Sequence, residues 1–576
     1  MALWVLGHAC AILLFALLCC GVGRALTLRL VPACPAELRV AFSIAAGTLL
    51  LGQTLFILAA IGRLTRWNVI VVLCIMAAIS ITQIRLGRVW IRVAAIAVTT
   101  TPAFLLALYP PVGFDATTYH LPYARLFAET GRLAFADTLR FPVFPQLGEI
   151  VFAGALLVAD DITAQLTQWL ALLVTTLAVA SIARELQNRA AAWLATSLWL
   201  GTPLALYLGG NAYIDSSLTM FVTLAFAAFM RWRNDANPRW AMLAGLLAGA
   251  AAATKYHGLF FVLALFVVIA WRSRRTGAAF LLAAAVIAAP WYVRIAIETG
   301  NPVFPFLSAI FGRSEWPTKV DAQLENPAAA FIPSTAQHPF ATIVDRALVD
   351  RVVVGHPPHN PWLLLLLPLA GVPLALDRRM RAPLVTAFAY GLIVATLDWR
   401  FLIAIVPLLA IAIASAITRI AASMRFDSRR SAIAAAILFA APGFGWTALL
   451  LRSFGAGALD PRRRDAFVAK RIEVYDALQF LGRTRGKPVI YIYFEENAAY
   501  YCPGRCMGEL YGPYRYQYIE GLLDQPKALA ARLRSFGVDV LVLRGPVRGR
   551  VESGGAFRRI YADGKAVALE VPKSAR

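Results

Sequence analysis

Long apolar runs recur along the whole chain, and they restrict its fold more than any other feature of the sequence. Runs of about 17–22 residues are long enough to cross a lipid bilayer as α-helices. Hydrophobic residues make up 60% of the chain and charged residues 15%, whereas soluble domains have about 45–50% and about 25%. The sequence predicts an all-α polytopic membrane bundle of about 12–14 transmembrane helices. The candidate spans are residues 3–23, 41–62, 67–83, 90–109, 162–182, 190–208, 216–230, 241–254, 256–271, 278–297, 362–376, 382–396, 401–417 and 431–451.

Arginines gather in alternate connections between these runs, and this asymmetry predicts the orientation of the bundle. The arginine-rich connections, predicted to be cytoplasmic, lie near residues 24–39, 85–92, 184–189, 231–239, 272–275, 378–381 and 425–430. The periplasmic side of a bacterial inner membrane then holds residues 110–161, 209–215, 298–361 and 452–576. Anionic lipid headgroups account for the net charge of +23. No basic patch with exposed aromatic residues indicates a nucleic-acid partner.

The composition changes after residue 451. Residues 487–494 and 538–544 read as short buried strands, and helical periodicity lies between them at 525–536. We predict a small α/β periplasmic domain, in which Cys502 and Cys506 either form a disulfide or remain free thiols. The predicted division is N-terminal transmembrane helices at 1–109, a periplasmic catalytic loop with interfacial helices at 110–161, a transmembrane core with periplasmic loop 298–361 at 162–451, and the α/β domain at 452–576.

The first long run that is not lipid-soluble, residues 110–145, carries several ionisable groups in a short stretch. Asp115, Tyr119 and His120 crowd together there, and helical spacing would turn Asp115 and Tyr119 roughly the same way. Ionisable groups held where a membrane meets water are costly and usually functional. We therefore predict a catalytic loop, with Asp115 as its acidic residue.

A second acid, Asp215, begins an apolar helix on the same predicted side. An aspartate before two serines is typical of a helix N-cap. Together with Asp115, it could also divide the work of general base and electrostatic stabiliser, or share a divalent cation. The sequence leaves these alternatives open and leaves the metal ligands unknown.

Three basic residues lie near the predicted outer ends of helices: Lys255, Arg294 and Arg400. A lysine there can simply extend its charge to the interface, but a lysine or a tucked-in arginine also suits a phosphate. The histidines at 338, 356 and 359 lie in loop 298–361. We interpret them as irregular loop residues rather than metal ligands.

Several motifs in this order resemble the polytopic C-type glycosyltransferases. They are FDATTYHLP after a transmembrane helix, FPQLGE at an interfacial helix, Asp215 in NAYIDS, TKYHG, PWYVRIAIETGNPVFPF and the arginine of DWRFLIAIVP. The resemblance is to bacterial relatives of protein O-mannosyltransferases and lipid A aminoarabinose transferases, which are glycosyltransferase family 39-like. It covers roughly residues 90–420, with a looser likeness in the tail.

The resemblance implies transfer of a sugar from a polyprenyl-phosphate-linked donor, usually with inversion at the anomeric carbon. It implies that Asp115 deprotonates or orients the acceptor and that Asp215 assists. It also implies that Lys255, Arg294 and Arg400 bind the donor phosphate, with Tyr119 and His120 beside the substrate. The acceptor is a lipid, a glycan or a protein.

Two other functions stay open. A lipid-linked glycan flippase or transporter would line a pathway with its intramembrane charges, although the ionisable residues here gather at one face. An O-antigen ligase or polymerase would also use lipid-linked sugars, with arginines and a histidine in a late outer loop such as the one holding His356 and His359.

Overall fold

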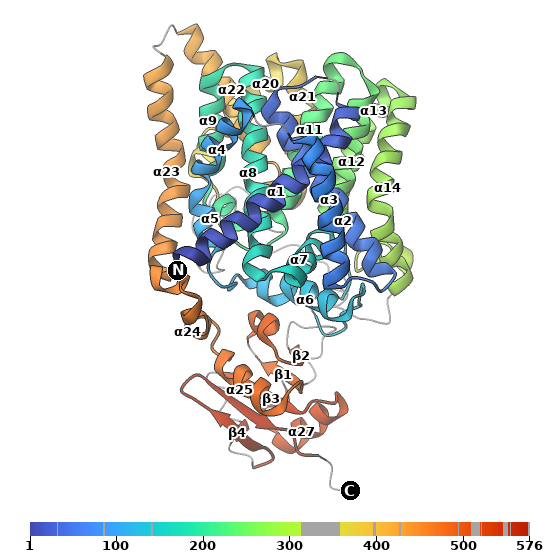
Figure 1. Cartoon of the computed structure of the whole chain (residues 1–576), viewed down its shortest axis with the longest axis vertical. Coiled ribbons are helices and arrows are strands. Elements are labelled where there is room, and N and C mark those ends of the chain that lie inside the picture. The colour runs from blue at the N-terminus through green and yellow to red at the C-terminus, as the bar shows by residue number, and fades with distance from the viewer. Residues whose placement is uncertain are drawn as a thin grey trace.

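A computed structural model describes residues 1–31, 33–84, 87–139, 142–312, 357–395, 399–424, 428–493, 495–508, 519, 521–544, 551–552 and 555–573. Helices form one large bundle, and a small domain built on a sheet lies below one end of it (Figure 1). The predicted fold class, a polytopic helical membrane bundle with a small C-terminal α/β domain, is confirmed.

In the described part of the chain, seven helices are long and apolar enough to cross a membrane. They are α1 (Ala2–Leu30), α2 (Ala36–Ala60), α3 (Arg66–Gln83), α8 (Asp161–Leu186), α14 (Arg274–Thr299), α22 (Val406–Ser423) and α23 (Ser428–Phe454). Two bent helix pairs pass the same test only when each pair is taken together, as a broken span or a re-entrant loop: α4 (Arg88–Thr99) with α5 (Thr101–Ala107) at 65°, and α9 (Arg189–Leu200) with α10 (Pro203–Gly209) at 73°. A proline lies in the first turn of the second helix of each pair, where it is accommodated although it would interrupt a continuing helix.

With each bent pair counted as one span, the described residues contain up to nine spans of this kind, fewer than the 12–14 predicted. The remaining predicted spans are helices of the same bundle that are shorter, broken or more charged. They are α11 (Asp215–Asp235), α12 (Pro238–Thr254), α13 (His257–Arg272), α21 (Arg378–Ala395), and the broken segment α19 (Pro361–Leu365), η3 (Leu367–Ala370) and α20 (Gly371–Leu376). A short helix, α15 (Ser308–Phe311), follows α14.

Helices α1 and α2 pack closely because small residues line their contact. A Cβ atom added at Gly23 would lie 1.8 Å from the carbonyl oxygen of Ser43, and one at Gly47 would lie 1.9 Å from that of Cys19. Glycine at such a crossing lets helix backbones approach, which is the usual way in which membrane helices associate.

Between the bundle and the small domain lie the short helices of the first polar loop (Figure 1). They are the π-helix η1 (Ala116–His120), α6 (Leu121–Thr130) and α7 (Leu147–Val158). At about 1.5 Å per residue, α7 is too short to cross a bilayer, as the sequence predicts. Its first eight residues, Leu147–Gly154, are buried against α2, α6 and α8, so protein rather than the lipid interface surrounds them.

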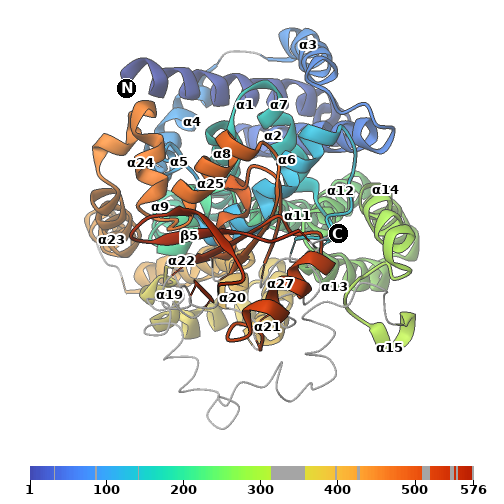
Figure 2. The ribbon, with the colours of Figure 1, turned by 90° about the horizontal axis from the view of Figure 1, so that it is seen from below.

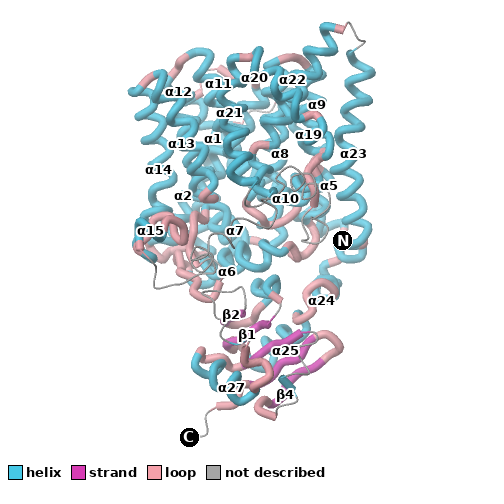
Figure 3. The backbone as a smooth tube through the Cα atoms, turned by 180° about the vertical axis from the view of Figure 1, so that it is seen from behind, coloured by secondary structure: helices cyan, strands magenta, loops and turns pink. Residues whose placement is uncertain are grey.

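The C-terminal domain contains a five-stranded sheet in the order β2-β1-β3-β5-β4 (Figure 3). Its strands are β1 (Val489–Tyr493), β2 (Arg505–Gly508), β3 (Val540–Arg544), β4 (Arg558–Ala562) and β5 (Ala566–Glu570). Strands β2, β1 and β3 are parallel, whereas β5 is antiparallel to β3 and β4. The domain's short helices are η5 (Ala456–Leu459), η6 (Pro461–Arg463), α24 (Arg464–Ala469), α25 (Tyr475–Arg485), η7 (Glu496–Tyr501) and α27 (Pro526–Ser535). Strands β1 and β3 and helix α27 lie where the sequence predicts them.

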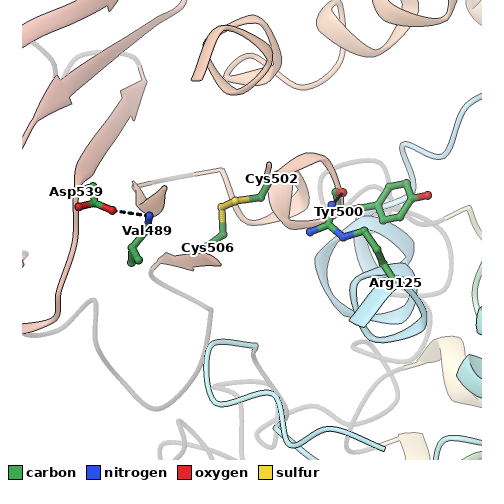
Figure 4. The surroundings of a disulfide bond; sticks show 6 residues. All are labelled: Arg125, Val489, Tyr500, Cys502, Cys506 and Asp539. Atoms are coloured by element: carbon green, nitrogen blue, oxygen red, sulfur yellow. Dashed lines mark hydrogen bonds between the residues drawn. A yellow bond between two sulfur atoms is a disulfide. The ribbon is translucent and has the colours of Figure 1, made fainter. Parts of the chain in front are cut away.

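Seen from below, the C-terminal domain covers the end of the bundle that carries α6 and α7 (Figure 2). Its η7 helix packs against η1. Arg125 of α6 donates a hydrogen bond to the carbonyl oxygen of Tyr500 at 2.5 Å, and Tyr501 donates one to that of Pro111 at 2.7 Å. A disulfide between Cys502 and Cys506 joins the end of η7 to β2 (Figure 4). The domain is therefore attached directly to the first polar loop.

Candidate functional site

Asp115 lies immediately before η1, a π-helix of five residues. Single turns of π-helix are rare and occur often at functional sites. Gly113 allows the chain to approach its neighbours here, because an added Cβ atom would lie 2.9 Å from the ring of Tyr213 and 3.0 Å from the side chain of Asn211. The backbone N–H of Asp115 donates a hydrogen bond to the hydroxyl oxygen of Tyr213 at 3.2 Å. The loop and the 211–213 turn are thus fixed against each other.

The carboxylate of Asp115 contacts a cation and a phenol through one oxygen atom. Nη1 of Arg400 lies 2.6 Å from its Oδ2, and the hydroxyl of Tyr119 donates a hydrogen bond to the same atom at 2.7 Å. All three side chains are buried. Burial and the nearby Asp115 carboxylate raise the pKa of Tyr119 well above its ordinary value, so the phenol keeps the proton that it donates.

Asp215 and Lys255 form a second ion pair. Asp215 is the first residue of α11 and is completely buried, and Lys255 ends α12. The Lys255 Nζ atom donates a hydrogen bond to Oδ1 of Asp215 at 3.0 Å. The N-cap residue of α11 is Ile214 rather than Asp215, and the side-chain partner of Asp215 among the described residues is Lys255. The Oδ2 atom of Asp215 has no hydrogen-bond partner among the described residues.

Aromatic rings connect the two pairs. The Phe401 ring centroid lies 4.4 Å from Nζ of Lys255 and 5.2 Å from Cζ of Arg400. The Tyr213 ring is a second aromatic contact of Arg400, with its centroid 5.4 Å from Cζ. A cation over a ring face is attracted by the ring quadrupole, so these rings hold both cations close together. Arg400 and Phe401 come from the short helix η4 (Trp399–Ala404), which precedes α22.

His120 lies next to this cluster but pairs with a different acid. Its Nδ1 atom is 2.6 Å from Oε1 of Glu149 in α7, and both side chains are buried. Its ring also lies against the ring of Tyr119 at 4.2 Å and that of Tyr213 at 6.1 Å. The Nε2 atom of His120 has no hydrogen-bond partner among the described residues.

Arg294 lies in a separate network. Its Nη1 atom donates a hydrogen bond to the side-chain oxygen of Gln146 at 2.6 Å, and Nη2 donates one to the carbonyl oxygen of Ala134 at 2.9 Å. Its guanidinium lies 5.6 Å from the Phe127 ring centroid. These contacts connect α14 to the loop between α6 and α7. The structure thus brings together Asp115, Tyr119, Asp215, Lys255 and Arg400, with His120 adjacent, and places Arg294 in the support of the loop.

Of the three histidines in loop 298–361, only His359 lies among the described residues. Its Nε2 atom donates a hydrogen bond to the carbonyl oxygen of Trp399 at 2.7 Å. It therefore positions the backbone just before Arg400. His338 and His356 lie outside the described residues.

The arrangement of the acids does not fit a shared divalent cation. Asp115 contacts a guanidinium and Asp215 contacts an ammonium group. Within the described ranges, no group of three or more His, Cys, Asp or Glu side chains is placed to hold a metal ion. Each of the two carboxylates is paired with a cationic side chain instead.

Tyr213, Phe401 and Glu149 belong to this region, although the sequence does not single them out. Phe401 directly follows Arg400, and Tyr213 lies two residues before Asp215. An aromatic residue close to a predicted functional charge was therefore the signal that could have identified both. Glu149 lies within the quoted FPQLGE motif. Its contact with His120 depends on the packing of α7 and has no local signal.

Comparisons with known proteins agree with the resemblance seen in the sequence. A family model described as dolichyl-phosphate-mannose-protein mannosyltransferase matches residues 150–297, and a model described as SF2091/S2213 matches residues 463–569. An uncharacterised protein of Shigella flexneri is 32% identical over 119 residues, which are 20% of this chain. This chain spans 59% of the length of that relative.

Two kinds of solved structure are similar to this chain at low sequence identity. ArnT from Cupriavidus metallidurans bound to undecaprenyl phosphate has 16% identity and a TM-score of 0.48, over 85% of this chain and 99% of that chain. The archaeal oligosaccharyltransferase AglB from Archaeoglobus fulgidus, in complex with an inhibitory peptide and a dolichol-phosphate, has 12% identity and a TM-score of 0.43, over 79% and 70%. Over residues 150–297 the chain is similar to the dolichyl-phosphate-mannose-protein mannosyltransferases, and its predicted resemblance to the C-type glycosyltransferases is confirmed.

Proposed function

We propose that this multi-pass membrane protein is a glycosyltransferase that moves a sugar from a polyprenyl-phosphate-linked donor to an acceptor at the periplasmic face of a bacterial inner membrane. The observation that carries the proposal is the pair of cations, Arg400 and Lys255, on the ring of Phe401, each beside a buried carboxylate. The family match supports the transferase class, and the first polar loop supplies a carboxylate, that of Asp115.

Arg400 and Lys255 are assigned to the donor phosphate. Breaking the bond between the sugar and the phosphate leaves a polyprenyl phosphate with added negative charge. Cations already in position stabilise that charge as it develops, and a buried site strengthens the effect. A guanidinium can bind two phosphate oxygens at once, whereas the lysine acts as a compact charge. The two residues thus complement each other.

Asp115 is assigned as the general base for the acceptor hydroxyl. In the structure its Oδ2 atom contacts Arg400 and accepts a hydrogen bond from Tyr119, so these two side chains occupy the oxygen that an acceptor hydroxyl would approach. A donor phosphate that draws Arg400 away would free this oxygen for the acceptor hydroxyl. Under this proposal, the base becomes active only when the donor is bound, which limits unproductive reaction with water.

The neighbouring residues are assigned to positioning. Asp215 holds the ammonium group of Lys255, and its second oxygen can accept from a sugar hydroxyl. His120, fixed by Glu149, presents Nε2 beside Tyr119 and can contact the substrate. Arg294 holds the loop before α7 through Gln146.

Reconstituted protein and a labelled sugar on undecaprenyl phosphate test this function. We expect label to appear in a lipid, glycan or protein acceptor, with no transfer from the same sugar on a nucleoside diphosphate. Labelled lipid that crosses the bilayer without losing its sugar would instead establish a flippase. Transfer of a whole glycan from a diphosphate carrier would establish the ligase or polymerase alternative.

A further inference from the structure

A large cavity lies in the half of the bundle away from the C-terminal domain, between α4, α8, α9 and α23. Its volume is about 840 Å³, which is within the range of pockets that enclose small molecules. Small side chains such as Ala95, Ala180 and Ala436 line it, together with Ile96 and Ile437. Short side chains at these positions leave space that larger ones would fill. The catalytic pairs are not among its lining residues.

One end of the cavity is basic. Arg92, Arg184 and Arg189 line it with a single acid, Glu37, which leaves an excess of two positive charges. Glu37 pairs with Arg92 and, at 3.1 Å, with Nη2 of Arg184. Arg189 lies over the Trp193 ring at 5.2 Å and has no carboxylate partner among the described residues. An anion is therefore the group that this end would attract.

The rest of the cavity reaches the lipid-facing surface of the bundle. Helix α23 stands along the outer edge beside α9 (Figures 1 and 3). Ile437 of α23 lines the cavity and is 68% exposed, and Ile433, also in the lining, is 42% exposed. An apolar chain could lie against these residues without leaving the bilayer.

We infer that this cavity binds an anionic phospholipid, with its phosphate at Arg92, Arg184 and Arg189 and an acyl chain along α4, α8, α9 and α23. The apolar walls suit the acyl chain of a membrane lipid, and the basic end suits its anionic headgroup. Basic pockets between transmembrane helices are a recognised way to hold lipid headgroups. A free anion would use the arginines but not the apolar walls. The inference does not depend on the proposed sugar transfer.

Native mass spectrometry of the full chain, titrated with phosphatidylglycerol or with phosphatidylcholine, tests the site. We expect selective binding of phosphatidylglycerol. Arg189→Gln should raise its Kd about fivefold, the effect of one cation near an anionic headgroup. Arg272→Gln is the matched control, because Arg272 also lies over a tryptophan, Trp232, but does not line the cavity; it should leave Kd unchanged.

A second variant tests the apolar part. Ala436→Phe should fill the cavity and weaken binding, whereas Ala441→Phe, at an exposed position of the same helix outside the lining, should not. Equal binding by the wild type, Arg189→Gln and Ala436→Phe would overturn the inference. So would full competition by inorganic phosphate, which would indicate a site for a free anion. Preference for undecaprenyl phosphate over phosphatidylglycerol would overturn the assignment of a phospholipid.

Discussion

The guanidinium of Arg400 lies 2.6 Å from Oδ2 of Asp115, and both side chains are buried. The acid comes from the first polar loop and the arginine from the short helix before α22. A pair formed from such distant segments requires the whole bundle to be folded. It also gives one arginine two possible partners, the aspartate and a donor phosphate.

Replacing Arg400 with lysine should lower kcat/KM for the donor about 10-fold to 100-fold. The charge is kept, but a lysine cannot make the bidentate contact with phosphate that an arginine can make. Initial rates against donor concentration measure the effect. Arg379→Lys is a suitable control, because Arg379 pairs with Asp377 at a different position in the bundle. Equal losses in the two variants would contradict a specific role of Arg400 with phosphate.

The pair of Lys255 and Asp215 should show strong coupling in stability. Lys255→Met leaves the buried Asp215 carboxylate without its cation, which should cost about 3–5 kcal/mol. The double variant Lys255→Met/Asp215→Asn should recover most of this loss while remaining inactive. Thermal unfolding in detergent measures the two single variants, Lys255→Met and Asp215→Asn, and the double variant. If the two losses simply add, the ion pair does not hold this part of the structure together.

Gly113→Ala should reduce transfer by up to about 100-fold, because small displacements near a reacting centre are costly. The new methyl group would meet the ring of Tyr213, whose hydroxyl oxygen accepts the hydrogen bond from the backbone N–H of Asp115. Gly371→Ala adds a methyl group with no atom within 4 Å and serves as the control. Unchanged activity in Gly113→Ala would show that this contact does not position the loop.

The disulfide between Cys502 and Cys506 should stabilise the C-terminal domain by about 2 kcal/mol, the loop-closure value for a short ring. Cys502→Ser/Cys506→Ser should unfold at lower temperature, and reductant should lower the wild type to the same value. Because η7 packs on η1, transfer activity should fall as well. Cys74→Ser, which removes an exposed free thiol, should change neither property.

The sequence predicts most of the helices because a membrane span requires a long apolar run, and that requirement is local. It also predicts β1, α27 and β3, whose apolar patterns are clear. It does not single out β4, which is largely exposed, or β2, which has only four residues. Strand β5 is buried, but two of its residues are alanines, which are poor strand formers, and a polar turn precedes it.

The residue types of the candidate site could be predicted, whereas its pairings could not. The cost of placing charge at a membrane surface singles out Asp115, Asp215, Lys255 and Arg400 one by one. Which acid meets which cation depends on the packing of helices far apart in sequence. The same limit applies to Arg294, whose partner Gln146 lies in a different segment.

Sugar transfer by Asp115→Asn directly tests the role of Asp115 as general base. The substitution keeps the shape of the side chain and removes the carboxylate. Transfer from the polyprenyl-phosphate donor should fall about 100-fold to 10,000-fold, the usual contribution of a general base, at a normal protein level. Asp137→Asn, in the same loop and paired with Arg505, should retain activity. Undiminished transfer by Asp115→Asn would contradict the assignment of Asp115 as the base.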